Sequence, residues 1–419
     1  MRSGKLERPL IMLSLDAISD HDIEYLLTLP NFRKLASWGL LHRKVDSLFI
    51  SNTYPVHTSI STGVLPSEHG LFDNVIYDPI KNKETWRAHK KLIKVKTLPE
   101  RAYEKGLVSC AMMYPCTPGE KIRYHLAEVP GTESMIYRGF KFLHYSSTFR
   151  LCPKFFRYMR KCRSFNYFGI DTFIAYTARD LIAQEKADFY MLHLQDTDHQ
   201  KHHTGIDSET TKKSIEYDDK LLGVLIEGIE EAERKAGGDP SKGISHLDIL
   251  IFSDHSCMNV HTNILPNKLL QEAGITPESA WFQTVNGACF LHISENISSD
   301  KRAALDRFLE KFSALPGVRR RLTEQEMRDS GAIEAGFFLG FTPVSGYTFG
   351  AIKKGQHGYT LDNDNYTIFY LEIGPGLISE DQAGKETSGG CILEVGKKAI
   401  GIVENIPAPE TVSPDKADC

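Results

Sequence analysis

Cysteine is scarce in this chain of 419 residues, and the way it is placed excludes several kinds of site. The eight cysteines are scattered, and no two form a Cys-x-x-Cys pair, which argues against a zinc ribbon and against a dithiol redox motif. Cys110 and Cys289 lie in the apolar runs Leu107–Met113 and Ala288–Ile293, a placement typical of reduced core thiols. We therefore expect no disulfide framework.

Long apolar runs are missing as well. No uninterrupted run approaches the roughly 20 residues needed to cross a bilayer, and the charged start Met1–Leu10 lacks the apolar stretch of a signal peptide. We therefore expect a cytoplasmic protein, unless an export leader has been removed. The net charge of −4 argues against a global affinity for nucleic acids or membrane surfaces, but it leaves local basic patches open.

What is present is enough apolar material for a large core, with 41% hydrophobic and 25% charged residues. Short apolar runs alternate with amphipathic segments, which predicts an α/β fold with a doubly wound, mainly parallel sheet and helices on both faces. The expected strands are Pro9–Leu15, Leu107–Met113, Phe189–Leu194, Asp248–Phe252, Ala288–Ile293 and Thr367–Ile373. Helical spacing occurs in Asp171–Lys186, Ser208–Lys235 and Lys301–Leu315.

The organisation along the chain favours a single domain over residues 1–407, followed by a frayed tail over 408–419. Two segments are expected to leave the main sheet. One is a cap insertion at about 78–168, rich in Lys, Arg and aromatic residues, and the other is a small αβ excursion at about 288–345.

Acidic and histidine-bearing loops follow three of the predicted strands, and a fourth such loop lies further downstream. Sheets of this type place ligands at the carboxyl ends of their strands, and Asp and neutral His are the usual ligands of zinc and related ions. A single Asp after a strand is more often a turn former or helix cap, so the joint occurrence carries the prediction of a metal site. The side chains concerned are Asp16, Asp198, His202, Asp254, His255 and His357.

A candidate nucleophile precedes the run of small residues Ser59–Gly63. Pro55 suits the first turn of a helix, which would put Thr53 at the helix N-terminus. The free amides and the helix dipole at that point favour a phosphate. On local grounds, Thr53 could instead serve only as the helix N-cap.

Taken together, these residues resemble the nucleotide pyrophosphatase/phosphodiesterase (type I phosphodiesterase) family of the alkaline phosphatase superfamily, from about Pro9 to Asn363. The family motif Thr-Phe-Pro-Asn-His-x-x-Ile-x-Thr-Gly is similar to Thr53–Gly63. Its Asp-x-x-x-His, Ser-Asp-His-Gly-Met and His-Gly-Tyr motifs are matched by residues 198–202, 253–258 and 357–359. Ala17, Val56 and Ser256 depart from the family pattern, and none of them replaces a ligand.

The resemblance implies an alkaline-phosphatase-like fold and a role for each matched residue. Asp16, Thr53, Asp254 and His255 would hold one divalent metal ion, and Asp198, His202 and His357 would hold a second. Thr53 would be the nucleophile, Asn74 would donate to a phosphate oxygen, and Tyr54 would line the pocket of the leaving group. Zinc is the default from the ligand types, with manganese and iron left open.

The expected activity is hydrolysis of phosphodiester or phosphoanhydride bonds, by in-line attack of Thr53 through a phosphothreonine intermediate. The substrate would be a small phosphate-containing molecule, with nucleotides among the candidates. Phosphonoacetate hydrolases, which cleave a C–P bond, share the same seven positions and remain an alternative, as does a non-catalytic binding relative. The basic and aromatic stretch Lys154–Arg163 leaves nucleic-acid binding as a third option. We expect no stable nucleic-acid partner, and the oligomeric state stays open.

Overall fold

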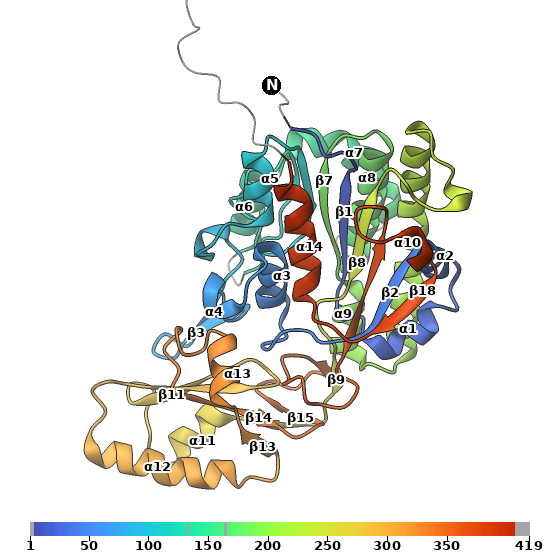
Figure 1. Cartoon of the computed structure of the whole chain (residues 1–419). Helices are drawn as coiled ribbons and strands as arrows, with labels where there is room; N and C mark the ends of the chain where they lie inside the picture. Colours follow the sequence, from blue (N-terminus) through green and yellow to red (C-terminus); the bar gives the residue numbers. More distant parts are fainter. Residues whose placement is uncertain (1–3, 132–133, 163–165, 407–419) are drawn as a thin grey trace, which may run out of the picture.

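A central sheet of eight strands organises the computed structural model, which describes residues 4–131, 134–162 and 166–406 (Figure 1). Strand β17 runs antiparallel to both of its neighbours, and the other pairings in this sheet are parallel. In spatial order the strands are β18 (Lys385–Ser388), β2 (Gly39–Val45), β17 (Ile368–Ile373), β8 (Asp248–Phe252), β1 (Leu10–Leu15), β7 (Phe189–Leu194), β5 (Ser109–Met112) and β6 (Tyr124–Leu126). The predicted α/β fold with a mainly parallel sheet is confirmed. The predicted tail 408–419 lies outside the described residues.

Helices cover both faces of this sheet, which explains why β1 is buried along its whole length. Because side chains alternate along a strand, Ile11 and Leu13 pack into one hydrophobic layer while Leu10 and Met12 pack into the other. The first layer is closed by α1 (Asp20–Leu26), α2 (Pro30–Trp38), α7 (Thr148–Cys162), α8 (Tyr167–Ala183) and α10 (Glu209–Lys235). The second is closed by α3 (Thr53–Thr62), α5 (Leu98–Glu104) and α14 (Leu393–Glu404).

A second, antiparallel sheet lies beside the main one (Figure 1). Its strands are β11 (Ala280–Thr284), β12 (Cys289–Ile293), β14 (Leu339–Pro343) and β13 (Val318–Arg321), accompanied by α11 (Pro266–Glu272), α12 (Ser299–Ser313) and α13 (Glu324–Asp329). Phe308 and Phe312 of α12 pack on one side of this sheet. On the other side Phe290 contacts Phe72, with ring centroids 4.9 Å apart, and thereby joins the second sheet to the segment that follows α3.

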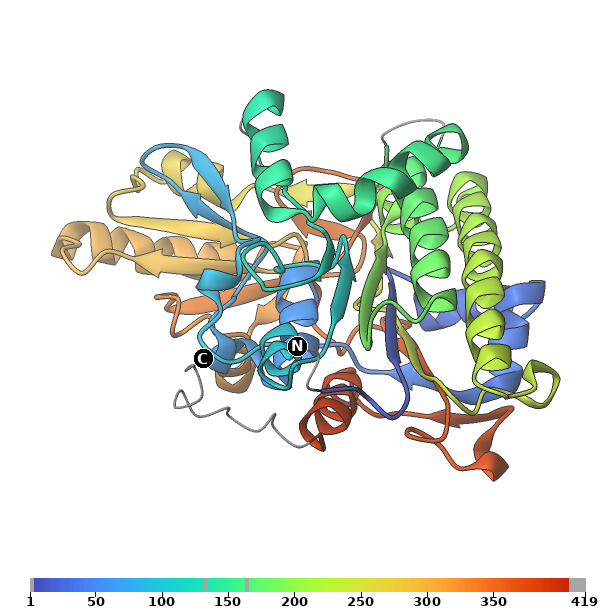
Figure 2. The same cartoon turned by 90° about the horizontal axis from the view of Figure 1, so that it is seen from above.

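The segment 78–168 contributes both to the main sheet and to its periphery. Strands β5 and β6 complete the edge of the main sheet. The hairpin of β3 (Val75–Asp78) and β4 (Lys83–Trp86) lies outside it, and so does α6 (Met135–Tyr145). Figure 2 shows α6 standing away from the body of the molecule. The domain boundaries given above stay a prediction. Among the described residues, none of the helices has both the length and the apolar character required to span a membrane.

Helix α2 takes its N-terminal cap from another helix. Its own N-cap residue, Leu29, has no side chain that can accept a hydrogen bond. The carboxylate of Asp219 in α10 accepts from the backbone N–H groups of Asn31 and Phe32, at 3.1 and 2.7 Å. A carboxylate at this end also suits the helix dipole. This contact therefore fixes how α2 and α10 pack on the sheet.

Replacing Asp219 by alanine is expected to lower the free energy of unfolding by about 2 kcal/mol, because buried donors lose their acceptor. The midpoint of urea unfolding measures this change. The control is Asp219→Asn, which keeps an acceptor oxygen and should lose less than half as much. Equal midpoints for wild type and Asp219→Ala would contradict the capping role.

Candidate metal and phosphate site

The candidate ligands meet because β1 lies between β7 and β8 and runs parallel to both. Asp16 follows the carboxyl end of β1, and Asp254 and His255 follow that of β8. After β7 the chain enters α9 (Asp196–Thr204), where Asp198 and His202 are four residues apart and share one face of the helix. The strand order thus explains why residues so distant in sequence meet.

Asp16, Asp254 and His255 form the first candidate metal group, with ligand atoms that all lie within 4.8 Å of one another. The three side chains are buried. Burial raises the pKa of Asp254 to about 7, aided by the neighbouring charge of Asp16. Asp16 Oδ1 and Asp254 Oδ2 are buried and have no hydrogen-bond partner. Two such carboxylates fit a bound cation, which would compensate their charge.

Asp198, His255 and His357 form the second candidate group, again with ligand atoms within 4.8 Å of one another. His357 follows β16 (Gly355–Gln356), which pairs with β9 (Met258–Asn259) just downstream of His255. The rings of His255 and His357 stack at a centroid distance of 4.0 Å. His202 Nε2 lies 3.3 Å from Asp198 Oδ2, so the fourth candidate ligand adjoins this group.

Hydrogen bonds set the tautomers of two of these histidines. The Nδ1 atom of His357 lies 2.7 Å from the amide oxygen of Asn52, and Nδ1 of His202 lies 2.7 Å from the Gly355 carbonyl. Because both partners can only accept, Nδ1 carries the proton in each ring and Nε2 keeps its lone pair. Burial lowers the pKa of both rings. Neutral imidazoles with a free Nε2 are the form that binds metal ions.

Thr53 is the first residue of α3, and its side chain does not cap that helix. The N-cap position belongs to Asn52. Thr53 Oγ1 lies 3.3 Å from Nε2 of His255, the residue shared by both metal groups. The hydroxyl therefore stands at the helix N-terminus and at the edge of both clusters.

The amide of Asn74 is oriented by the backbone. Its Oδ1 accepts a hydrogen bond from the N–H of Tyr54 at 2.8 Å, which leaves the Nδ2 group as the donor. Asn74 thus contacts the first turn of α3 at Tyr54, the residue that follows Thr53.

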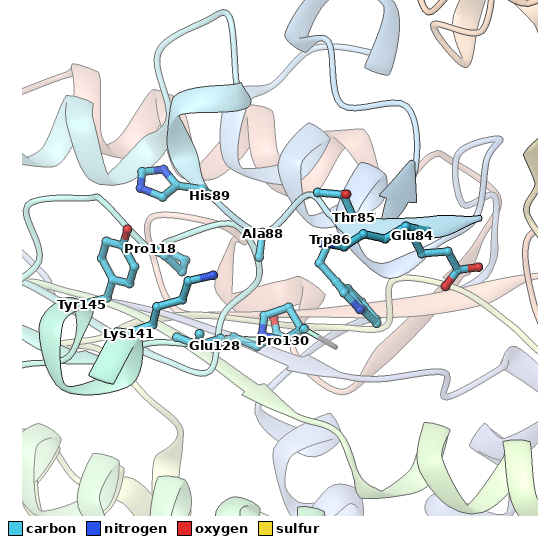
Figure 3. A pocket seen from close by; sticks show the side chains of 13 residues that line it. Glu84, Thr85, Trp86, Ala88, His89, Pro118, Glu128, Pro130, Lys141 and Tyr145 are labelled. Atoms are coloured by element: carbon cyan, nitrogen blue, oxygen red, sulfur yellow. The ribbon is translucent and has the colours of Figure 1, made fainter. Parts of the chain in front are cut away.

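The Tyr54 side chain is buried. Two residues that contact it, Trp86 and Glu128, line a pocket of about 170 Å³ (Figure 3). The rings of Tyr54 and Trp86 have centroids 5.7 Å apart. Burial raises the pKa of the Glu128 carboxyl to about 7, although His193 and the Tyr54 hydroxyl lower it. Figure 3 shows Trp86 and Tyr145 on opposite sides of the pocket, with Lys141 between them. Tyr54 itself is not among the residues that line it.

Three further residues surround the site: His193 and Lys201, which no motif marks, and His57, which lies within the Thr53–Gly63 motif. His193 of β7 lies 3.0 Å from Asp16 Oδ2, and His57 donates to the Thr53 carbonyl at 2.8 Å. Lys201 is fully buried between α9 and the loop after β1, where its ammonium donates to the Ala17 carbonyl at 2.7 Å. The spacing of His57, four residues after Thr53, is the one feature that could have suggested its role.

The family model for type I phosphodiesterase/nucleotide pyrophosphatase matches residues 10–335. The chain belongs to this family. The predicted resemblance is thereby confirmed. The match covers β1, α3, α9 and β8, and it ends before His357.

Similar proteins extend this finding. The chain is 25% identical over 255 residues to the human ectonucleotide pyrophosphatase/phosphodiesterase family member 5, covering 59% of this chain and 45% of that protein. It is also 25% identical over 249 residues to bovine family member 3, covering 24% of that protein. The chain thus spans less than half the length of these relatives.

The structure of murine family member 5 has a TM-score of 0.67 and 16% identity, and the similarity covers 96% of both chains. The human structure of family member 5 gives a TM-score of 0.66 at 18% identity. These similarities confirm the alkaline-phosphatase-like fold of this member of the phosphodiesterase family.

Replacing Asn52 by alanine is expected to weaken the binding of Zn²⁺ about 10- to 100-fold, because His357 loses the acceptor that orients its ring. Titration of the metal-free protein against a chromogenic chelator measures this affinity. Asn296→Ala, at an exposed asparagine between β12 and α12, serves as the control. Unchanged zinc affinity in Asn52→Ala would contradict the orienting role.

Proposed function

We propose that this protein hydrolyses phosphodiester or phosphoanhydride bonds with Thr53 as nucleophile. The observation that supports this most directly is the position of the Thr53 hydroxyl at a helix N-terminus, 3.3 Å from the histidine common to both metal groups. Membership of the type I phosphodiesterase/nucleotide pyrophosphatase family supports the same reaction.

The residues of the two clusters fit a pair of divalent cations, and zinc is the proposed ion. Asp16, Asp254, His255 and Thr53 would hold one cation, and Asp198, His202 and His357 would hold the other. When bound, such ions favour the ionised form of a hydroxyl and offset the charge of a phosphate. Asp16 and Asp254 each have a buried carboxylate oxygen that accepts no hydrogen bond, which supports this assignment.

In the proposed reaction, Thr53 Oγ1 attacks phosphorus and forms a new P–O bond as the bond to the leaving group breaks on the opposite side. The leaving oxygen departs with the electron pair and takes up a proton. Water then attacks the phosphothreonine, and the Thr53 hydroxyl is restored. The hydrogen bond of His57 to the Thr53 carbonyl holds the first turn of α3 in place during both steps.

The phosphate is oriented by donors of the chain itself. The free Nδ2 group of Asn74 and the first N–H groups of α3 would donate to the non-bridging oxygens. Donors fixed in advance at the positions where charge develops are among the largest contributions to catalysis. The hydrogen bond from Tyr54 N–H keeps Asn74 in the required orientation.

A nucleotide is the proposed substrate. One of the similar structures is murine family member 5 as an inactive threonine-to-alanine variant in complex with AMP. In this chain the pocket beside Tyr54 offers the indole of Trp86 and the ring of Tyr145, and its volume of about 170 Å³ suits one planar ring system. Aromatic side chains of this kind stack on nucleobases.

Thr53→Ala is expected to slow turnover of the p-nitrophenyl ester of thymidine monophosphate at least about 1,000-fold, because the covalent route is lost. Release of p-nitrophenol by zinc-loaded protein measures the rate. Acid quenching with ³²P-labelled substrate should trap labelled protein in the wild type and none in the variant.

Thr53→Ser is the matched control, since it keeps a hydroxyl and should retain part of the activity. Equal rates for wild type and Thr53→Ala would remove Thr53 from the reaction. Faster turnover of phosphonoacetate than of the diester would favour C–P hydrolysis at the same site.

Asn74→Ala is expected to lower kcat about 100- to 1,000-fold, because one donor to the developing charge is missing. Asn74→Asp sharpens the test, since the carboxylate can still accept from Tyr54 N–H but cannot donate to phosphate. Steady-state kinetics on the diester should give low kcat for both variants. Wild-type kcat in Asn74→Asp would rule out the donor role.

A further inference from the structure

Helix α6 presents an apolar stripe to solvent. Ile136, Phe140 and Leu143 are each more than half exposed. Their spacing of four and three residues puts them on one face of the helix. In Figure 2, α6 and α7 lie along one edge of the molecule.

Helix α7 follows α6 in the chain, also exposes large hydrophobic side chains, and is divided into three faces. Leu151 and Tyr158 are buried against the main core. Lys154 and Arg157 lie on a second face, where both contact Asp180 of α8. The third face points to solvent and carries large hydrophobic side chains, the most exposed of which is Phe149 at 96%. We define the α6–α7 apolar surface as Ile136, Phe140, Leu143, Phe149, Phe156 and Met159.

The charge of this segment is of one sign. Residues 134–162 contain seven Lys and Arg residues and no Asp or Glu, in a chain whose net charge is −4. The cations are Arg138, Lys141, Arg150, Lys154, Arg157, Arg160 and Lys161. Large hydrophobic side chains that stay in water mark interaction surfaces. Lys154 and Arg157 are paired with Asp180, whereas the exposed cations Arg150 and Arg160 favour a negatively charged partner.

We propose that the α6–α7 apolar surface docks this protein on an anionic lipid bilayer. Amphipathic helices with Phe and Leu on one face and Lys and Arg on the other lie in the headgroup region of membranes. Juxtamembrane cations add attraction to anionic lipids. Single-stranded nucleic acids bind through stacking on aromatic rings, which Ile136, Leu143 and Met159 cannot provide, so the aliphatic half of the surface favours a bilayer.

Membrane docking does not depend on the proposed catalysis, but it would affect where the pocket beside Tyr54 lies relative to the membrane. Lys141 and Tyr145 of α6 line the pocket that adjoins Tyr54. Docking through α6 would therefore hold the pocket close to the plane of the lipid headgroups.

The test is co-sedimentation of the full chain with vesicles, compared between pure phosphatidylcholine and a 70:30 mixture of phosphatidylcholine and phosphatidylserine. We expect stronger binding to the mixed vesicles, and weaker binding to them at 0.5 M salt, where surface charges are screened. Equal or absent binding to the two vesicle types would overturn the proposal. Binding to single-stranded RNA without vesicle binding would overturn it in favour of a nucleic-acid surface.

Two sets of substitutions separate the apolar and charged contributions. Ile136→Ser, Phe140→Ser and Leu143→Ser combined should reduce vesicle binding at least about tenfold, because the inserted apolar area is lost. Phe338→Ser with Ile352→Ser, at exposed positions just before β14 and β16, is the matched control and should bind as wild type. Arg150→Gln with Arg160→Gln should lower binding about fivefold for each charge removed. Wild-type binding by the triple serine variant would refute the assignment, provided that its urea midpoint is unchanged.

Discussion

The parallel pairing of β1 with both β7 and β8 is the constraint on which the site depends. It brings three carboxylates, those of Asp16, Asp198 and Asp254, to one edge of the sheet, where Asp16 and Asp254 are buried and Asp198 is partly buried. Burial raises the pKa of both Asp16 and Asp254; the charge of Asp198 adds to this effect on Asp16, and the charge of Asp16 adds to it on Asp254. The fold therefore gathers acidic side chains at one place, where a bound cation would compensate their charge. His255, His357 and Thr53 lie beside these carboxylates.

The sheet could be predicted from the sequence where local pattern and burial agree. The bounds of β7 and β8 are as predicted, because each is a short apolar run that ends at acidic or polar residues. Strand β2 gave no such pattern, since His42, Arg43 and Lys44 follow its apolar half. In the structure, His42 stacks on Tyr370 and hydrogen-bonds Glu372, both in β17. A strand stabilised by residues more than 300 positions away has no local signature.

The candidate site likewise contains residues that the sequence pattern marks and residues that it does not. The candidate ligands directly follow strands or lie in recognisable motifs, so the sequence could nominate them; the structure brings them together in two groups, and their role as ligands stays a prediction. Asn52 was not predicted, because its role depends on a contact with His357 at a separation of 305 positions. Lys201 stood among polar neighbours in a helix, where a solvated side chain is the usual expectation. Its burial follows from the approach of α9 to the loop after β1. Side chains that support the site thus become visible only in three dimensions.

The position of β2 has a consequence for the order of folding. Both of its neighbours in the sheet, β17 and β18, come from the last part of the chain. During synthesis β2 therefore emerges more than 300 residues before either of its strand partners. Long-range pairings of this kind close late and slowly. Until those strands arrive, both edges of β2 expose unpaired backbone N–H and C=O groups that could pair with another chain.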